Sequence, residues 1–142
     1  MKRLILLLVI LLPLYTMAQD VTISSMMKEY SAKEKCTTIN LSSSMLRSMG
    51  VEMGADNLRA ISIEDSALVP RFEGQVQSVV AGLDAIMSVS DNGKSVEIYQ
   101  RTNGYGRVSD LVIFVKGCDE CVLMHIRGKD LELSKAGSLI EF

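Results

Sequence analysis

The sequence is poor in the residues on which most catalytic sites are built. It contains no tryptophan, a single histidine and three cysteines, and aromatic residues make up 5% of it. Sugar-binding sites usually rely on aromatic platforms, and a glycosidase needs two acids that face each other across a cleft. No serine lies in a G-x-S-x-G elbow, and no glycine-rich loop leads into a helix. The sequence therefore predicts no catalytic set and no cofactor. Whether the protein is an enzyme stays open, and the lack of a catalytic set favours a protein without enzymatic activity.

Positive charge is also scarce. The chain has 15 Lys and Arg against 17 Asp and Glu, a net charge of −2, and no run of basic residues. A protein that binds duplex nucleic acid needs a clustered basic face, so nucleic acid is excluded as a partner. A length of 142 residues suits one domain and is too short for a TIM barrel.

The first eighteen residues have the layout of a secretory signal peptide. A basic start, Met1–Arg3, precedes the apolar run Leu4–Leu14, and Thr16 and Ala18 place small residues before a cleavage site. The apolar run is shorter than the roughly 20 residues of a membrane span. We expect cleavage after Ala18 and a periplasmic or secreted product; an uncleaved N-terminal anchor is the alternative.

The mature chain, residues 19–142, is expected to form a single α+β domain with no membrane span. Ile23, Met26 and Tyr30 lie on one helical stripe, and Asn92-Gly93 is a strong hairpin signal. Periodicity of this kind predicts helices over 21–34, 42–49 and 68–81, strands over 36–41, 58–64, 86–90, 95–101, 108–116 and 121–127, and a last helix that begins at Asp130.

The order of these elements predicts a two-layer sandwich. Helices must cover the apolar face of a sheet, and the last four strands follow one another through short turns. We therefore expect a largely antiparallel sheet of about six strands with helices packed on one face. The last four strands should form a meander, and the strand over 108–116, the most apolar of them, should lie near its centre.

Three stretches resemble a known family. They are the helical run 26–34, the segment 83–89 that leads into the hairpin, and the run 124–133 with its Gly-x-x-Leu. On these motifs the chain resembles domain-of-unknown-function family 4252, secreted or lipid-anchored envelope proteins of the Bacteroidetes. The resemblance implies a protein of the Gram-negative envelope and supplies no catalytic residues. Members often carry a lipid-anchoring cysteine after the signal peptide, and this chain has none there.

The cysteines are the residues most able to carry chemistry. Cys118 and Cys121 form a C-x-x-C motif, which can close a disulfide, hold a soft metal or exchange thiols. Redox catalysis needs a thiolate favoured by a helix N-terminus or by cations, whereas this motif lies between two strands and contains Asp119 and Glu120. A structural disulfide or inert thiols are favoured. A small thiol-redox protein, with Cys36 as resolving thiol, is the alternative, and a metal site is not expected.

His125 alternates with Met124 and Ile126 on the last predicted strand, so it should point to the opposite face, toward solvent. The remaining hypothesis is an interaction module that binds another envelope protein, or a second copy of itself, through a sheet face or edge. It predicts an exposed apolar patch or an unprotected edge strand.

Overall fold

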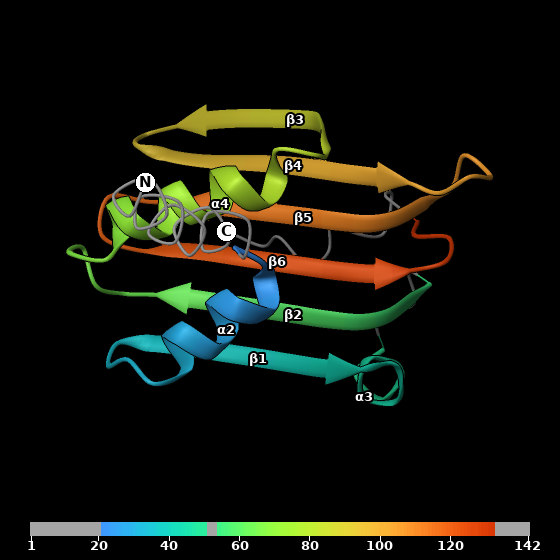
Figure 1. The fold of residues 1–142 in the computed structure, drawn as a ribbon, viewed down its shortest axis with the longest axis horizontal. Coiled ribbons are helices and arrows are strands. Elements are labelled where there is room, and N and C mark those ends of the chain that lie inside the picture. The colour runs from blue at the N-terminus through green and yellow to red at the C-terminus, as the bar shows by residue number, and fades with distance from the viewer. Residues whose placement is uncertain (1–20, 51–53, 133–142) are drawn as a thin grey trace, which may run out of the picture.

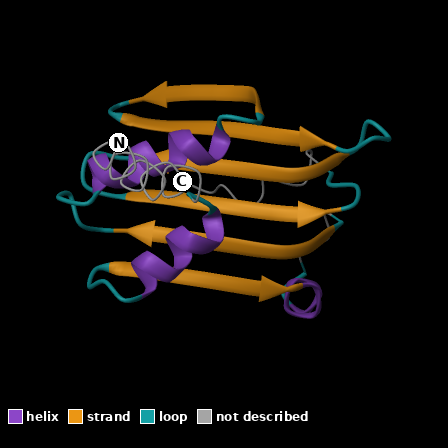
Figure 2. Cartoon of the chain, in the orientation of Figure 1, coloured by secondary structure: helices purple, strands orange, loops and turns teal. Residues whose placement is uncertain are grey.

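A six-stranded antiparallel sheet with short helices packed against it forms the described part of the chain, residues 21–50 and 54–132 of a computed structural model (Figure 1 and Figure 2). The α+β prediction is confirmed. In chain order the elements are α2 (Ile23–Ser31), β1 (Cys36–Ser42), α3 (Ser43–Ser48), β2 (Ala55–Ile63), α4 (Val69–Val80), β3 (Asp84–Asp91), β4 (Lys94–Thr102), β5 (Val108–Lys116) and β6 (Cys121–Gly128).

The strands lie in the order β1-β2-β6-β5-β4-β3. The last four strands form the predicted meander, and β5 and β6 occupy the centre of the sheet. The β3–β4 hairpin turns at Asn92 and Gly93, which both have positive φ (52° and 80°), as a tight hairpin requires. The chain leaves β2 through α4, which carries it across the sheet to β3 at the opposite edge (Figure 1).

Helices α2 and α4 cover one face of the sheet. Each presents an apolar stripe at helical spacing, and Pro70 lies in the first turn of α4, where its missing N–H costs nothing. An aromatic chain joins both helices to the sheet. The ring of Tyr30 meets that of Phe72 edge-on at 5.2 Å between centroids, and Phe72 lies 6.1 Å from Phe114 of β5. The three side chains are almost completely buried.

The opposite face of the sheet buries a second apolar cluster. Successive side chains of a strand point to opposite faces of the sheet. Ile61 therefore belongs to the helix-covered cluster and its neighbour Ala60 to the second cluster. The second cluster includes Leu111, Ile113 and Ile126, and Leu46 of α3 packs with it. Both faces of the central strands are therefore buried, which explains the continuous apolar run of β5.

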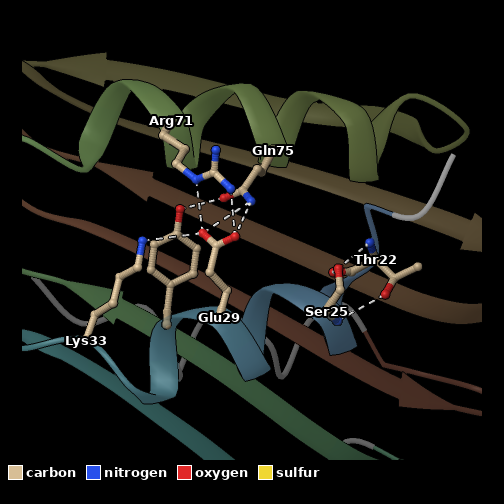
Figure 3. A network of polar contacts seen from close by, with 7 residues as sticks. Thr22, Ser25, Glu29, Lys33, Arg71 and Gln75 are labelled. Carbon is tan, nitrogen blue, oxygen red and sulfur yellow. Dashed lines mark hydrogen bonds and ion pairs between the residues drawn. The ribbon is translucent and has the colours of Figure 1, made fainter. Parts of the chain in front are cut away.

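A polar clamp joins α2 to α4 above the sheet (Figure 3). The guanidinium of Arg71 donates two hydrogen bonds to the Glu29 carboxylate, at 2.8 and 3.1 Å. Gln75 donates to the same carboxylate and accepts a hydrogen bond from the hydroxyl of Tyr30. The hydrogen bond and charge of Arg71 lower the pKa of Glu29 to about 2, against the effect of burial. These hydrogen bonds join the two helices to each other.

Two predictions fall outside the described residues: the signal peptide over 1–18 and the last helix, whose expected stripe lies beyond residue 132. Within residues 21–50 and 54–132, no helix is long and apolar enough to cross a membrane.

Candidate functional site

The most exposed element of the sheet is the edge strand β3. Each of its eight residues is exposed, and among the described elements it is hydrogen-bonded to β4 alone. Three large apolar side chains, those of Ile86, Met87 and Val89, lie in solvent on this strand, with Val89 at 50% exposure. The strand therefore combines exposed apolar surface with an outer edge to which no other described strand is paired.

The sequence of β3 combines features that favour pairing with another strand and features that limit it. Lysine and proline, which usually block the pairing of an edge strand, are absent from it. A bulge between Ala85 and Met87 sets Ile86 outside the regular register with β4. Asp84 and Asp91 stand at the two ends, so the strand is apolar in the middle and acidic at its ends.

The other edge of the sheet, β1, is less suited to binding. Its exposed positions alternate with half-buried ones, and Ile39, 45% exposed, is its one large exposed apolar side chain. The rest of the strand is rich in threonine, asparagine and serine. The interaction hypothesis predicted an exposed apolar patch or an unprotected edge strand. Strand β3 is an edge strand with exposed apolar side chains, and its bulge and terminal acids limit its pairing in part.

The structure separates the cysteines by environment. Cys118 is exposed, Cys36 is half-buried, and Cys121 is buried with 1% exposure; all three are free thiols. Burial raises the pKa of the Cys121 thiol, and the nearby Glu73 adds to this effect. Burial also raises the pKa of Cys36, with a further contribution from Asp65. Neither Cys36 nor Cys121 is activated as a nucleophile, because activation requires a lowered pKa.

Cys36 and Cys121 lie on the two strands that flank β2, too far apart to form a disulfide. Both are paired in register with Ile63, from opposite sides of β2. Neighbouring strands are about 4.8 Å apart, so the two Cα atoms are about 10 Å apart, beyond the roughly 7 Å limit for a disulfide. Among the described residues no group of three or more His, Cys, Asp and Glu side chains is placed to hold a metal ion.

The prediction that His125 faces solvent is wrong. It does point to the face opposite Met124 and Ile126, but α2 and α4 cover that face, and its exposure is 7%. Its Nδ1 lies 3.0 Å from an Nη of Arg59 and its Nε2 lies 2.9 Å from Oδ1 of Asp110. Alternation correctly assigned the face, but only the packing of the helices could show that this face is buried.

Comparison with known proteins places the chain in one family. The family described as "Domain of unknown function (DUF4252)" matches residues 30–139, well over half of the chain. Neither the curated proteins nor the solved structures contain a match.

Proposed function

The chain belongs to the DUF4252 family of domains of unknown function, and we propose that it is an exported, non-catalytic protein-binding domain of the cell envelope. The observation that carries the proposal is the edge strand β3, exposed along its whole length and apolar at its centre. An extended segment of a partner protein would add to this edge as a seventh strand, with main-chain hydrogen bonds for affinity and side chains for specificity.

The charges of β3 favour a different protein over a second copy as the partner. If two β3 strands paired antiparallel along their full length, Asp84 of one copy would lie opposite Asp91 of the other at both ends. Like charges directly opposite each other destabilise a strand pair. The fitting partner is therefore an extended segment with apolar, β-branched residues in the middle and a lysine or arginine near each end.

The thiol-redox alternative has less support. It rests on the pair Cys118 and Cys121, with Cys36 as resolving thiol. Burial and a nearby acid raise the thiol pKa of both Cys36 and Cys121, and the opposing charges of Lys33 and Lys116 do not reverse this direction. Cys118, the exposed thiol of the C-x-x-C motif, is the group on which that alternative would depend.

The test of the binding function uses the mature chain and two synthetic peptides. Each peptide has eight residues, the length of β3, with alternating valine and threonine in the middle; one has lysine at both ends and the other glutamate. We expect the lysine peptide to bind saturably and to slow amide exchange along β3. Equal binding of the glutamate peptide, or no binding of either, would contradict the proposal.

A pair of variants on opposite edges of the sheet supplies the control. Val89→Lys places a charge on the β3 edge, and Ile39→Lys makes the same kind of change on β1 at similar exposure. We expect at least ten-fold weaker peptide binding for Val89→Lys and no change for Ile39→Lys. A wild-type dimer that Val89→Lys converts to a monomer would instead identify a second copy as the occupant.

Export is part of this proposal and has its own test. We expect the protein recovered from the periplasm or medium of the producing cell to begin at Gln19, with Met1–Ala18 removed. Intact-mass measurement of the recovered protein decides the point. An unprocessed N-terminus in the membrane fraction would show the alternative, an uncleaved anchor.

A further inference from the structure

A cavity of about 300 Å³ lies on the helix-covered face of the sheet, and no residue of β3 lines it, although Leu83, directly before β3, does. Its walls come from the start of α2, the end of α4 and the central strands. The first turn of α2 and the last turn of α4 lie toward the same end of the sheet, where β4 ends and β5 begins (Figure 1). The cavity therefore lies where these elements meet.

The floor of the cavity is strongly cationic. Three guanidinium groups, those of Arg59, Arg101 and Arg127, line it together with a single carboxylate, Asp110. The strand register explains the grouping, because Arg101 and Arg127 are both paired with Asp110, one from each neighbouring strand. In the whole protein acids outnumber bases, so the local excess of positive charge is not a general property of the surface.

The only histidine of the chain lies in this floor and is neutral. A guanidinium has donors only, so Nδ1 of His125 accepts from Arg59 and the proton resides on Nε2, which donates to Asp110. Burial lowers the pKa of His125, the charges of Arg59 and Arg127 add to this effect, and the hydrogen bond to Asp110 opposes it. The one carboxylate has three partners: His125, the hydroxyl of Ser109, and Arg127, whose Nε lies 3.7 Å from Oδ1 of Asp110.

Two of the cations keep unused hydrogen-bond donors. The Nε–H of Arg59 is buried and has no partner among the described residues, although its Nη groups donate to Ser24 and His125. The guanidinium of Arg101 forms no hydrogen bond or ion pair within the described parts of the chain. Leaving a buried donor without a partner is unfavourable, and within the described residues the guanidinium of Arg101 keeps its donors for an anion.

The walls of the cavity are apolar on the side of α4. Val79 and Leu83 line it there, and Ile23 and Val112 contribute from α2 and β5. A cation cluster beside an apolar wall matches a ligand with a charged head and an apolar body. A volume of about 300 Å³ lies at the lower end of the range for small-molecule sites.

We propose that this cavity binds a small organic anion whose carboxylate or phosphate group is held by Arg59, Arg101 and Arg127. The apolar part of the ligand packs against Val79 and Leu83. Arginine suits this task because its planar fork of donors matches both groups. Asp110 does not cancel the site, since it is outnumbered by the arginines and is bonded to His125.

The test uses the single histidine as a reporter in the full mature chain. Because the protein has one imidazole, its NMR signals need no further assignment. The probes are hexanoate and hexyl phosphate, with hexanol, hexylamine, acetate and inorganic phosphate as controls. We expect the two amphiphilic anions to shift the His125 signals saturably, less strongly at high salt, and their relative affinities to show which head group the site prefers.

Two arginine variants separate the site from general charge effects. Arg101→Gln removes an exposed cation that forms no hydrogen bond or ion pair with the described residues, so the fold should persist, whereas Arg47→Gln removes an exposed cation from α3 that does not line the cavity. We expect at least ten-fold weaker binding for Arg101→Gln and unchanged binding for Arg47→Gln. An equal loss of binding in both variants would contradict the proposed site.

The control probes can also overturn the proposal. If hexanol binds as well as hexanoate, the cavity is only an apolar hollow. If acetate and inorganic phosphate bind as well as the amphiphilic anions, the apolar wall has no role. If none of the probes shifts His125 at millimolar concentration, the cavity does not bind organic anions. None of these results bears on the β3 edge, which the peptide experiment tests separately.

Discussion

At the scale of single residues, His125 couples the stability of the protein to pH. Its neutral ring accepts from Arg59 and donates to Asp110, and Arg127 adds a further positive charge near the carboxylate. Protonation would place a charged ring against the guanidinium of Arg59 in a buried site. The fold therefore lowers the pKa of His125, with burial as the main cause.

The first prediction concerns this residue. His125→Phe should cost about 2 kcal/mol of unfolding free energy near pH 7.5, because Arg59 and Asp110 lose buried partners. Since the pKa is lower in the folded state, the unfolded chain binds more protons below the unperturbed value of about 6.5, and wild-type stability falls there as pH falls. Denaturant unfolding at pH 7.5 and 5.5 should show a smaller gap between the two proteins at pH 5.5; an unchanged gap would refute the assignment.

The second residue-scale prediction concerns a close approach of backbone. Gly54 has φ of 76°, and a Cβ there would lie 2.5 Å from the carbonyl oxygen of Asp130. Gly54→Ala should therefore destabilise the protein by more than about 1 kcal/mol. Gly82→Ala is the control, because nothing lies within 4 Å of its Cβ position. Thermal unfolding of both variants checks this, and similar melting temperatures would contradict it.

At the scale of elements, residue periodicity was sufficient to predict almost every helix and strand. The predicted strand 108–116 has the observed bounds, and the predicted helix 68–81 differs from α4 by one residue at each end. The helix predicted over 21–34 is shorter, Ile23–Ser31, with a capping box between Thr22 and Ser25 at its start. The apolar stripe of this helix ends at Tyr30, and after Ser31 the chain turns toward β1.

The third prediction concerns the clamp between α2 and α4. Glu29→Gln should lower the unfolding free energy by about 0.5–1 kcal/mol at pH 7, a partly exposed ion pair being worth no more. Because the pKa of Glu29 is lowered to about 2, the advantage of wild type is present above about pH 4.5 and is lost as pH falls toward 2.

A double-mutant cycle identifies the partner in this clamp. The cycle of Glu29→Gln with Arg71→Gln should show a stabilising coupling energy between the two side chains, because they share two hydrogen bonds. Lys33, whose Nζ lies 3.7 Å from the same carboxylate, is the matched control and should couple more weakly. A larger coupling with Lys33 than with Arg71 would disagree with the structure.

At the scale of the whole molecule, the sheet order decides which cysteines can react together. Ile63 of β2 separates Cys36 from Cys121, so Cys36 is not placed to act as the resolving thiol for Cys121. The β2–β6 contact joins segments about sixty residues apart (Arg59 is paired with His125). No local pattern specifies such a pair, because it depends on α4 crossing the sheet.

The fourth prediction follows from this arrangement. In the folded, reduced protein, an alkylating reagent should modify the exposed Cys118 first and the buried Cys121 last, and all three thiols should react after unfolding. Timed intact-mass measurement with peptide mapping gives the order. A Cys36–Cys121 disulfide after mild oxidation, or equal rates for Cys118 and Cys121, would be inconsistent with the packing of the sheet.

The sequence by itself determined the elements, the α+β class, the meander and the Asn92-Gly93 hairpin, because hydrophobic period and turn chemistry act over a few residues. Only the tertiary structure decided the position of β2 beside β6, the exposure of β3 and the burial of His125. Both faces of the central strands are covered, so alternation along a strand identifies a face without telling whether that face meets solvent. The cation cluster of Arg59, Arg101 and Arg127 likewise comes from three strands, and only their pairing brings it together.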